Sequence, residues 1–320
     1  MKRLIVGDLH LDARVGIKRV YEIVKDSLDK IAWLSHNYDE VIFLGDYFVK
    51  NSPSNYFRRL FSDFLVRVKP KKRKIFLKGN HDIDYSDGTP FIGSFSLDVL
   101  RSFLNEHDIV VDNFYEDDGV AYISYSLDFE KIAKFISETE CKLVFGHIAI
   151  GTYSLGEGIP ERKGEIQVAK KNTRYILGHI HKAQRVKRDD NIDIIYVGSI
   201  GPTNLGEIGY SSYLCSLIDD KLKKEDLKYG LEKIEVNNVD DINNINENSR
   251  VVIEIDDLSE KQIYLDKLKD KALSIEFRLK RKKVIIDSKI SFEKLLEEFL
   301  RKINKLYLLD KINKYINEAR

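Results

Sequence analysis

The length and composition of the chain limit the classes of protein that it can be. It has 320 residues, 43% of them hydrophobic, so we expect a packed core and, at about 150 residues per domain, two domains. The formal net charge of +1 provides no global field that selects nucleic acid, so any such binding must come from local basic patches. Cys141 and Cys215 are the only cysteines and lie in apolar runs, which argues against a disulfide framework or a cysteine-rich metal site. Met1-Lys2-Arg3 leads straight into a predicted strand, so we expect a cytoplasmic protein with no signal peptide and no membrane span.

Apolar runs and helical spacing predict alternating strands and helices along the chain. The predicted strands lie at residues 4–6, 41–44, 74–77, 120–125, 142–145, 174–177, 194–197, 250–255, 273–279 and 283–287. The predicted helices span residues 16–35, 56–65, 94–106, 129–136 and 259–270, with further helical segments after Ser291. The apolar stripe at 56–65 is rich in aromatic residues, which is typical of a core-facing helix but would also suit a subunit interface.

Five of the predicted strands end in a glycine that is followed by side chains able to bind a metal. These ends are Gly7-Asp8-Leu9-His10, Gly45-Asp46, Gly79-Asn80-His81-Asp82, Gly146-His147 and Gly178-His179-Ile180-His181. They contain five of the seven histidines. One such end could be a turn with a chance histidine, but ligands bind beyond the carboxyl ends of strands in open α/β folds. Carboxylates and imidazoles are ligands of divalent metals, so the pattern predicts one shared metal site.

In this order the motifs resemble the signature of the calcineurin-like metallophosphoesterase superfamily, which reads Asp-x-His, Gly-Asp, Gly-Asn-His-(Asp/Glu), Gly-His and Gly-x-His. The resemblance implies an α/β (α+β) fold, a four-layer β-sandwich of mixed sheets flanked by helices. It also implies two divalent metal ions that share Asp46 as a bridging ligand. One ion would be held by Asp8, His10, Asp46 and His181, and the other by Asp46, Asn80, His147 and His179.

This ligand set is suited to phosphodiester hydrolysis. Two carboxylates do not neutralise two divalent ions, so the site keeps a positive charge that favours a phosphodiester and its more charged transition state. His81 is not needed as a ligand and is left to stabilise or protonate the leaving oxygen. Asp82 either orients His81 or serves only as a turn residue.

A closer resemblance points to one branch of the superfamily. Gly45-Asp46-Tyr47-Phe48 with Ser52-Pro53-Ser54, and Tyr196-Val197-Gly198-Ser199 with Asn204-Leu205-Gly206-Glu207, are similar to motifs of SbcD-type nucleases. These are prokaryotic and phage relatives of the meiotic-recombination-eleven repair nuclease, and this chain differs from their usual motif in having valine at 197 and leucine at 205. The resemblance implies a manganese-dependent DNA exonuclease and endonuclease subunit of a double-strand-break repair and recombination complex, in the host cytoplasm if the source is viral.

Two alternatives remain. One is another enzyme of the superfamily, a phosphatase or a cyclic-nucleotide phosphodiesterase, although the smaller members usually lack a C-terminal α/β unit and terminal helices. The other is a non-catalytic scaffold, which has no reason to keep every metal ligand.

The resemblance also implies three parts of the chain. They are a nuclease domain at 1–229, a small α/β domain that caps DNA at 230–288, and C-terminal helices at 289–320. A basic run at the predicted hairpin of the cap is either a solvated turn or a phosphate contact: Lys280, Arg281, Lys282 and Lys283. An apolar face on the terminal helix either binds the coiled-coil base of an SbcC-like ABC-type ATPase or packs back on the cap: Leu296, Phe299, Leu300 and Ile303. The helices at 56–65 and 94–106 occupy the region that forms the family's homodimer, so a homodimer is expected.

Overall fold

The computed structural model describes residues 1–50, 52–83, 103–155, 160–188, 191–210, 212–227, 231–236, 242, 245, 248–268, 271–279 and 301. The chain divides into two compact units, Met1–Arg278 and Leu279–Arg320. The fold described here belongs to the first unit, apart from the last residue of its final strand.

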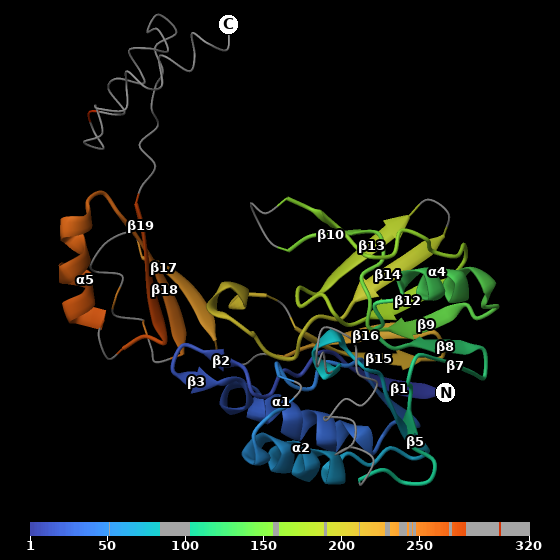
Figure 1. Ribbon diagram of the computed structural model, residues 1–320. Helices are drawn as coiled ribbons and strands as arrows, with labels where there is room; N and C mark the ends of the chain where they lie inside the picture. Colours follow the sequence, from blue (N-terminus) through green and yellow to red (C-terminus); the bar gives the residue numbers. More distant parts are fainter. Residues whose placement is uncertain are drawn as a thin grey trace, which may run out of the picture. The chain divides into compact units, whose positions relative to one another are not determined.

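Two six-stranded sheets form the centre of this unit (Figure 1). The first sheet has the order β16 (Lys221–Asp226), β15 (Tyr213–Ile218), β1 (Lys2–Val6), β4 (Glu40–Phe43), β5 (Arg73–Phe76) and β6 (Ile109–Val110). The second has the order β13 (Gln184–Arg188), β14 (Ile192–Tyr196), β12 (Arg174–Leu177), β9 (Leu143–Gly146), β8 (Val120–Ile123) and β7 (Phe114–Asp117). Strands β1, β4, β5 and β6 are parallel, as are β8, β9, β12 and β14. Strands β15, β16, β7 and β13 run antiparallel to their neighbours, so both sheets are mixed.

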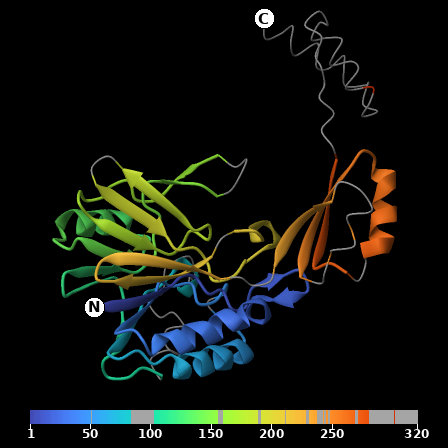
Figure 2. The same ribbon diagram turned by 180° about the vertical axis from the view of Figure 1, so that it is seen from behind.

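The alternation of side chains along the strands builds the layers. Ile5 of β1 belongs to a core that also contains Phe145 and Ile176 of the second sheet, so the two sheets pack face to face. Leu4 and Val6 point the other way, into a core shared with the helices α1 (Val20–Ser35) and α2 (Asn55–Arg67). The outer face of the second sheet is covered by α4 (Phe129–Glu138). Figures 1 and 2 show the resulting four layers, which confirm the predicted fold class.

The first predicted helix begins later than expected. Arg14–Val15 (β2) and Lys18–Arg19 (β3) pair as a small hairpin, and α1 starts only at Val20. Gly16 has a φ of +62° in the turn between them, a conformation that a helix does not use. Ile17 lies at this turn and is 85% exposed, so the prediction that the helix includes residues 16–19 was wrong.

The aromatic helix at 56–65 is α2, and most of its stripe is core. Phe57, Phe61, Phe64 and Leu65 are buried in the cluster that α2 shares with α1, whereas Tyr56 is half exposed. Residues 103–106 are turn and irregular backbone, so the helix predicted at 94–106 does not include them. Residues 94–102 lie outside the described residues, and the homodimer stays a prediction.

A third, smaller sheet forms near the end of the first unit. It has the order β17 (Glu232–Val236), β18 (Ser249–Ile255) and β19 (Ser274–Leu279), and it has its own core with α5 (Lys261–Leu268). Strands at 250–255 and 273–279 were expected, and the helix predicted at 259–270 consists of the short turn η5 (Leu258–Glu260) followed by α5. The parallel strand β17 was not predicted.

The remaining elements are short, and several predictions concern residues beyond them. The short elements are the hairpin of β10 (Thr152–Tyr153) and β11 (Arg162–Lys163) and the single turns η1 (Asn80–Asp82) and η3 (Leu205–Glu207). The strand predicted at 283–287, the basic run 280–283 and the apolar face at 296–303 lie outside the described residues, and the domain boundaries near 230 and 289 stay predictions. Across the part of the chain that the structure describes, no helix combines the length and the apolar character needed to cross a membrane.

Candidate metal centre

The carboxyl ends of the parallel strands bring four of the predicted ligands into one cluster. Asp8, His10, Asp46 and His181 each contribute a ligand atom, and these atoms all lie within 4.8 Å of one another. His10 Nε2 is 3.1 Å from His181 Nε2 and 3.5 Å from Asp46 Oδ2. All but His181 are almost completely buried.

The other three predicted ligands form a second group, which also approaches Asp46. Asn80 Oδ1 lies 3.1 Å from His147 Nε2 and 2.9 Å from His179 Nδ1. His147 Nε2 lies 3.4 Å from Asp46 Oδ2, the same oxygen that approaches His10. Asp46 therefore stands between two groups of potential ligands, which is the position that a bridging ligand requires.

Hydrogen bonds to the far side of the imidazoles determine which nitrogen carries the lone pair. The Nδ1 of His147 is 2.7 Å from the carbonyl oxygen of Leu44, to which it can only donate. The Nδ1 of His181 is 3.0 Å from Glu207 Oε1 in the same way. In each ring Nδ1 is the donor to this partner, so Nε2 is the nitrogen available to the cluster. Burial acts to lower the pKa of His147, but the neighbouring Asp46 outweighs it and raises that pKa to about 9, so a bound metal would displace the Nε2 proton.

The residues present fit divalent metal ions. His147 Nε2 and Asn80 Oδ1 lie 3.1 Å apart, and both are atoms that can bind a divalent cation. Asp8 Oδ2 is buried and has no hydrogen-bond partner among the described residues, although an unpaired buried carboxylate oxygen is costly. Carboxylate oxygen, amide oxygen and imidazole nitrogen are together the donor set of a divalent transition metal.

Burial and charge set the protonation of these groups. Burial lowers the pKa of His10 to about 3, so its imidazole is neutral, as a metal ligand must be. Burial acts to raise the pKa of Asp46, but the neighbouring His147 and His10 outweigh it and hold that pKa below its ordinary value. Burial also raises the pKa of Asp8. Two neighbouring carboxylates thus differ in acidity because histidines surround one of them more closely.

The backbone at this centre is strained in a way that points to function. His10, Asp46 and His179 have φ values of 44°, 53° and 75°, in the left-handed region that only glycine, asparagine and aspartate enter readily. The other described residues with positive φ that are not glycine are all asparagine or aspartate in turns. Gly79 allows the loops to meet, because a Cβ there would lie 2.0 Å from Asp46 Oδ1. The glycine before the ligand is therefore a requirement of close approach.

Residues 1–183 of the chain match the family model of the calcineurin-like phosphoesterases. The chain belongs to this family. A search of curated proteins gave no match. Among solved structures, this phosphoesterase is similar to a dimetal phosphatase from Danio rerio, with 11% identity over 72% of this chain and 96% of that chain and a TM-score of 0.40. It is also similar to a metallophosphoesterase from Sphaerobacter thermophilus, with 14% identity over 72% and 89% of the two chains and a TM-score of 0.35.

Asp82 of the phosphoesterase braces the loops that carry the ligands. Its buried carboxylate accepts hydrogen bonds from the backbone N–H groups of Asp46 (2.7 Å), Tyr47 (3.2 Å) and Gly79 (2.8 Å). These bonds join the end of β4 to the end of β5. These hydrogen bonds favour the interpretation of Asp82 as a turn residue over the alternative that it orients His81.

His81 is held beside the cluster by other groups. Its backbone N–H donates to Asp46 Oδ1 at 2.9 Å, and its Nδ1 lies 2.8 Å from the carbonyl oxygen of Val49. The ring is half-buried and meets the His10 ring edge-on, with 5.0 Å between centroids. Its Nε2 is thus left as the nitrogen that can exchange a proton, and the catalytic role stays a prediction.

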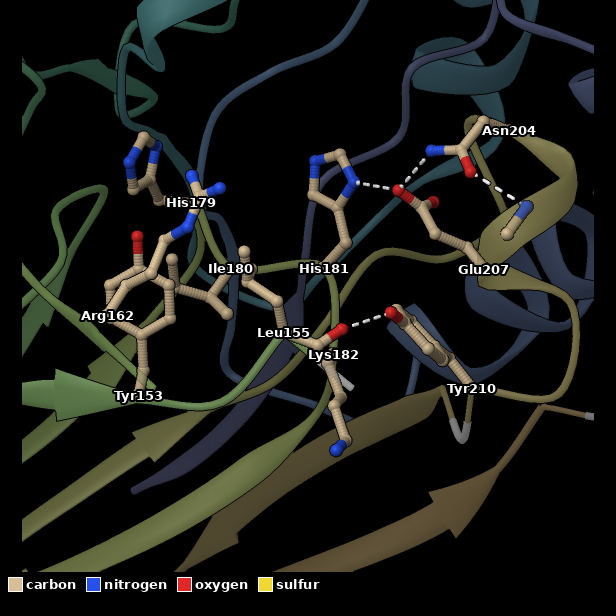
Figure 3. Close-up of a pocket in the computed structure, with 11 residues that line it drawn as sticks. Tyr153, Leu155, Arg162, His179, Ile180, His181, Lys182, Asn204, Glu207 and Tyr210 are labelled. Carbon is tan, nitrogen blue, oxygen red and sulfur yellow. Dashed lines mark hydrogen bonds and ion pairs between the residues drawn. The ribbon is translucent and has the colours of Figure 1, made fainter. Parts of the chain in front are cut away.

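A pocket of about 420 Å³ opens beside the two histidines of the last motif (Figure 3). His179, His181 and Glu207 belong to its lining. The rest of the lining consists of two tyrosines, two cations, two aliphatic side chains and two residues at the turn η3. These are Tyr153 and Tyr210, Arg162 and Lys182, Leu155 and Ile180, and Asn204 and Gly206. The Tyr210 hydroxyl donates to the carbonyl oxygen of Leu155 and fixes one wall.

Two carboxylates that orient ligands were not assigned a role from the sequence. Glu207 was quoted within a motif, but its bond to His181 was not foreseen. Glu165 Oε1 lies 3.4 Å from His179 Nε2, and its carboxylate also accepts from the backbone N–H of Ala149 at 3.3 Å. Glu165 does follow a glycine, Gly164, but the strand before it, β11, is charged and exposed, so the pattern of a buried apolar strand ending in glycine did not locate it.

Proposed function

We propose that this phosphoesterase is a manganese-dependent DNA exonuclease and endonuclease that hydrolyses phosphodiester bonds at a two-metal centre. The metal centre alone fits a phosphatase equally well. The observation that supports a nuclease is the pocket beside the centre, with Arg162 and Lys182 as cations and Tyr153 and Tyr210 as aromatic walls. A phosphatase needs room for one terminal phosphate, whereas a nucleic acid strand continues past the scissile bond with further phosphates and bases.

In this proposal, seven residues bind the metal ions and one residue, His81, donates a proton. Asp8, His10, Asp46 and His181 hold one ion, and Asp46 with Asn80, His147 and His179 holds the other. Divalent ions bound there supply Lewis-acid activation of water and neutralise charge on the phosphate. The imidazolium form of His81, with its Nδ1–H bonded to the Val49 carbonyl, would give its Nε2 proton to the leaving oxygen and become the neutral ring.

The proposed biological context extends to parts of the chain beyond the described residues. The resemblance to SbcD-type nucleases supports a role in double-strand-break repair and recombination with a coiled-coil ABC-type ATPase as partner, and a homodimer as the assembly. The C-terminal apolar face at 296–303 is the proposed ATPase contact, and the basic run at 280–283 the proposed DNA contact. A mixed imidazole, carboxylate and amide donor set supports manganese as the metal.

The test compares substrates on the full chain, stripped of metal and reloaded with Mn²⁺. The substrates are end-labelled duplex and single-stranded DNA, bis(p-nitrophenyl) phosphate as a simple diester and p-nitrophenyl phosphate as a monoester. We expect cleavage of DNA and of the diester, dependent on Mn²⁺. Hydrolysis of the monoester alone would support a phosphatase instead.

A pair of variants tests the contribution of the pocket. Arg162→Gln removes a cation from the lining, and Lys163→Gln makes the same charge change at the next, exposed residue of β11, which does not line the pocket. We expect Arg162→Gln to lower DNA cleavage by about tenfold, the effect of roughly one lost phosphate contact, and to leave hydrolysis of the simple diester unchanged. Equal effects of the two variants on DNA cleavage would remove the support that the pocket gives.

A further inference from the structure

The small sheet contacts the turn that carries Glu207. The guanidinium of Arg250, on β18, donates from NH1 to the carbonyl oxygen of Leu205 at 2.6 Å. Leu205 is the first residue of η3, and Glu207 is the last. The Glu207 carboxylate in turn accepts a hydrogen bond from Nδ1 of His181. A continuous path of contacts thus leads from the third sheet to a metal ligand.

We propose that Arg250 is a positioning residue for the metal ligand His181, acting through the turn η3 and Glu207. The inference depends on the metal centre of the family and not on which phosphodiester the enzyme cleaves. It adds a role for the third sheet, whose residues contribute no ligand to the centre.

Burial and an ion pair fix the position of the Arg250 side chain. Its side chain is only 12% exposed, and its second terminal nitrogen pairs with Glu276 on β19. Glu276 is itself held by Arg278, whose Nε donates to its other oxygen at 2.8 Å. A guanidinium that is fixed on one side by a carboxylate presents its other N–H groups in a defined direction. The Leu205 carbonyl is therefore held by a rigid, charged donor.

The turn η3 transmits this position because it is short and tightly bonded. Asn204 caps it by accepting from the Gly206 N–H at 2.8 Å, and Glu207 Oε2 accepts from the Thr203 N–H at 2.7 Å. A three-residue turn with fixed ends has little freedom to move Leu205 without moving Glu207. A displacement of Glu207 changes the direction of the His181 ring, because the Glu207 bond is what orients that ring.

Other contacts attach the small sheet near the same place. Lys18 Nζ, in the hairpin before α1, donates to Asn248 Oδ1 at 2.5 Å. Leu273, just before β19, packs into the core that contains Val20 and Val24 of α1. These contacts hold the third sheet to the hairpin before α1 and to the core around α1, independently of Arg250. Replacing Arg250 is therefore expected to alter the turn η3 without releasing the third sheet.

The test measures metal binding, which needs no substrate. Mn²⁺ affinity of the full chain is measured by isothermal titration calorimetry, and His181→Ala identifies the binding event that involves His181. We expect Arg250→Gln to weaken that event by about threefold to tenfold, less than the roughly 10–100-fold typical of a residue bonded directly to a ligand. Arg250→Lys keeps one donor for the Leu205 carbonyl and is expected to restore part of the loss.

Arg278→Gln is the matched control, since it also removes an arginine from Glu276 but has no bond to η3. Because Arg278 reaches Arg250 only through Glu276, this variant is expected to lose less affinity than Arg250→Gln. An unchanged affinity in folded Arg250→Gln would overturn the proposal, as would an equal loss in Arg278→Gln. If thermal melting shows that Arg250→Gln is unfolded at 25 °C, Arg250→Met, which keeps the aliphatic stem and removes every donor, decides by the same criterion, and wild-type affinity in it would overturn the proposal.

Discussion

Glu207→Gln is the substitution that isolates the orientation of a metal ligand from the ligand itself. Glu207 contributes no atom to the predicted metal ligands, yet its Oε1 accepts from His181 Nδ1 (3.0 Å), Asn204 Nδ2 (2.7 Å) and Thr203 Oγ1 (2.9 Å). Its Oε2 accepts from the Thr203 N–H at 2.7 Å. Burial raises the pKa of Glu207, but the bonds from His181 and Thr203 outweigh it and keep that pKa below its ordinary value, so the carboxylate is charged at neutral pH.

The size of the effect follows from these partners. The glutamine NH₂ must replace one of the two oxygens, and both positions face N–H donors, so one donor loses its acceptor at a cost of about 1–3 kcal/mol. If the amide oxygen stays near His181, the bond there changes from charge-assisted to neutral and loses about 1 kcal/mol. At about 1.4 kcal/mol per factor of ten, we expect Mn²⁺ affinity at the His181 side to fall by roughly 10–100-fold.

The assay is calorimetric titration of Mn²⁺ into the metal-free chain, with circular dichroism to show that the variant is folded. Glu225→Gln is the control, because Glu225 is an exposed glutamate on β16 that pairs with Lys30 and undergoes the same change of charge. The Mn²⁺ affinity of the binding event that is assigned to Asn80, His147 and His179 is expected to change little. A folded Glu207→Gln chain with wild-type affinity for both ions would show that Glu207 does not orient His181 for metal binding.

Three further predictions concern the bridge, the proton donor and the core. Asp46→Ala is expected to lose both metal ions and all cleavage, and two ions retained in native mass spectrometry would show that Asp46 is not the bridge. His81→Gln is expected to keep both ions and DNA binding while turnover falls by roughly 100-fold, and loss of metal would instead make it a ligand. Glu40 is fully buried between Arg3 Nε (2.8 Å) and Arg73 NH2 (2.6 Å), so Glu40→Ala is expected to lower the free energy of unfolding by about 3–5 kcal/mol in urea titration. A loss below about 1 kcal/mol would contradict the importance assigned to this buried pair.

The sequence was most informative where a buried strand changes abruptly into polar residues. The apolar run Val41–Leu44 predicts a buried strand, and Asp46, which follows it after Gly45, has no packing explanation and so predicts a site. Parallel pairing of β1, β4 and β5 then brings such ends to one edge without further information. This reasoning predicts a shared site, whereas the fold class and the grouping of Asp8, His10, Asp46 and His181 came from the family resemblance of the motifs, and the structure brings these four side chains together.

Elements that depend on long-range contacts could not be predicted. The helical spacing of Val20, Val24 and Leu28 extends backward to Ile17, but pairing of residues 14–15 with 18–19 overrides it. Strand β17 shows only a weak alternation of charged and apolar residues. Its backbone pairing with β18 makes it a strand, and that pairing is not visible in its local sequence. Glu207 and Glu165 reach the histidines only through the fold, because nothing in a glutamate's local sequence indicates which imidazole it orients.

The strand ends of the two sheets are proposed to hold two divalent ions that share Asp46 as a ligand. Anomalous diffraction at the manganese absorption edge, from crystals of the full chain grown with Mn²⁺, locates such ions. Two peaks are expected, one among Asp8, His10 and His181 and the other among Asn80, His147 and His179, each also in contact with Asp46. A single peak, or peaks that do not contact Asp46, would contradict this proposal.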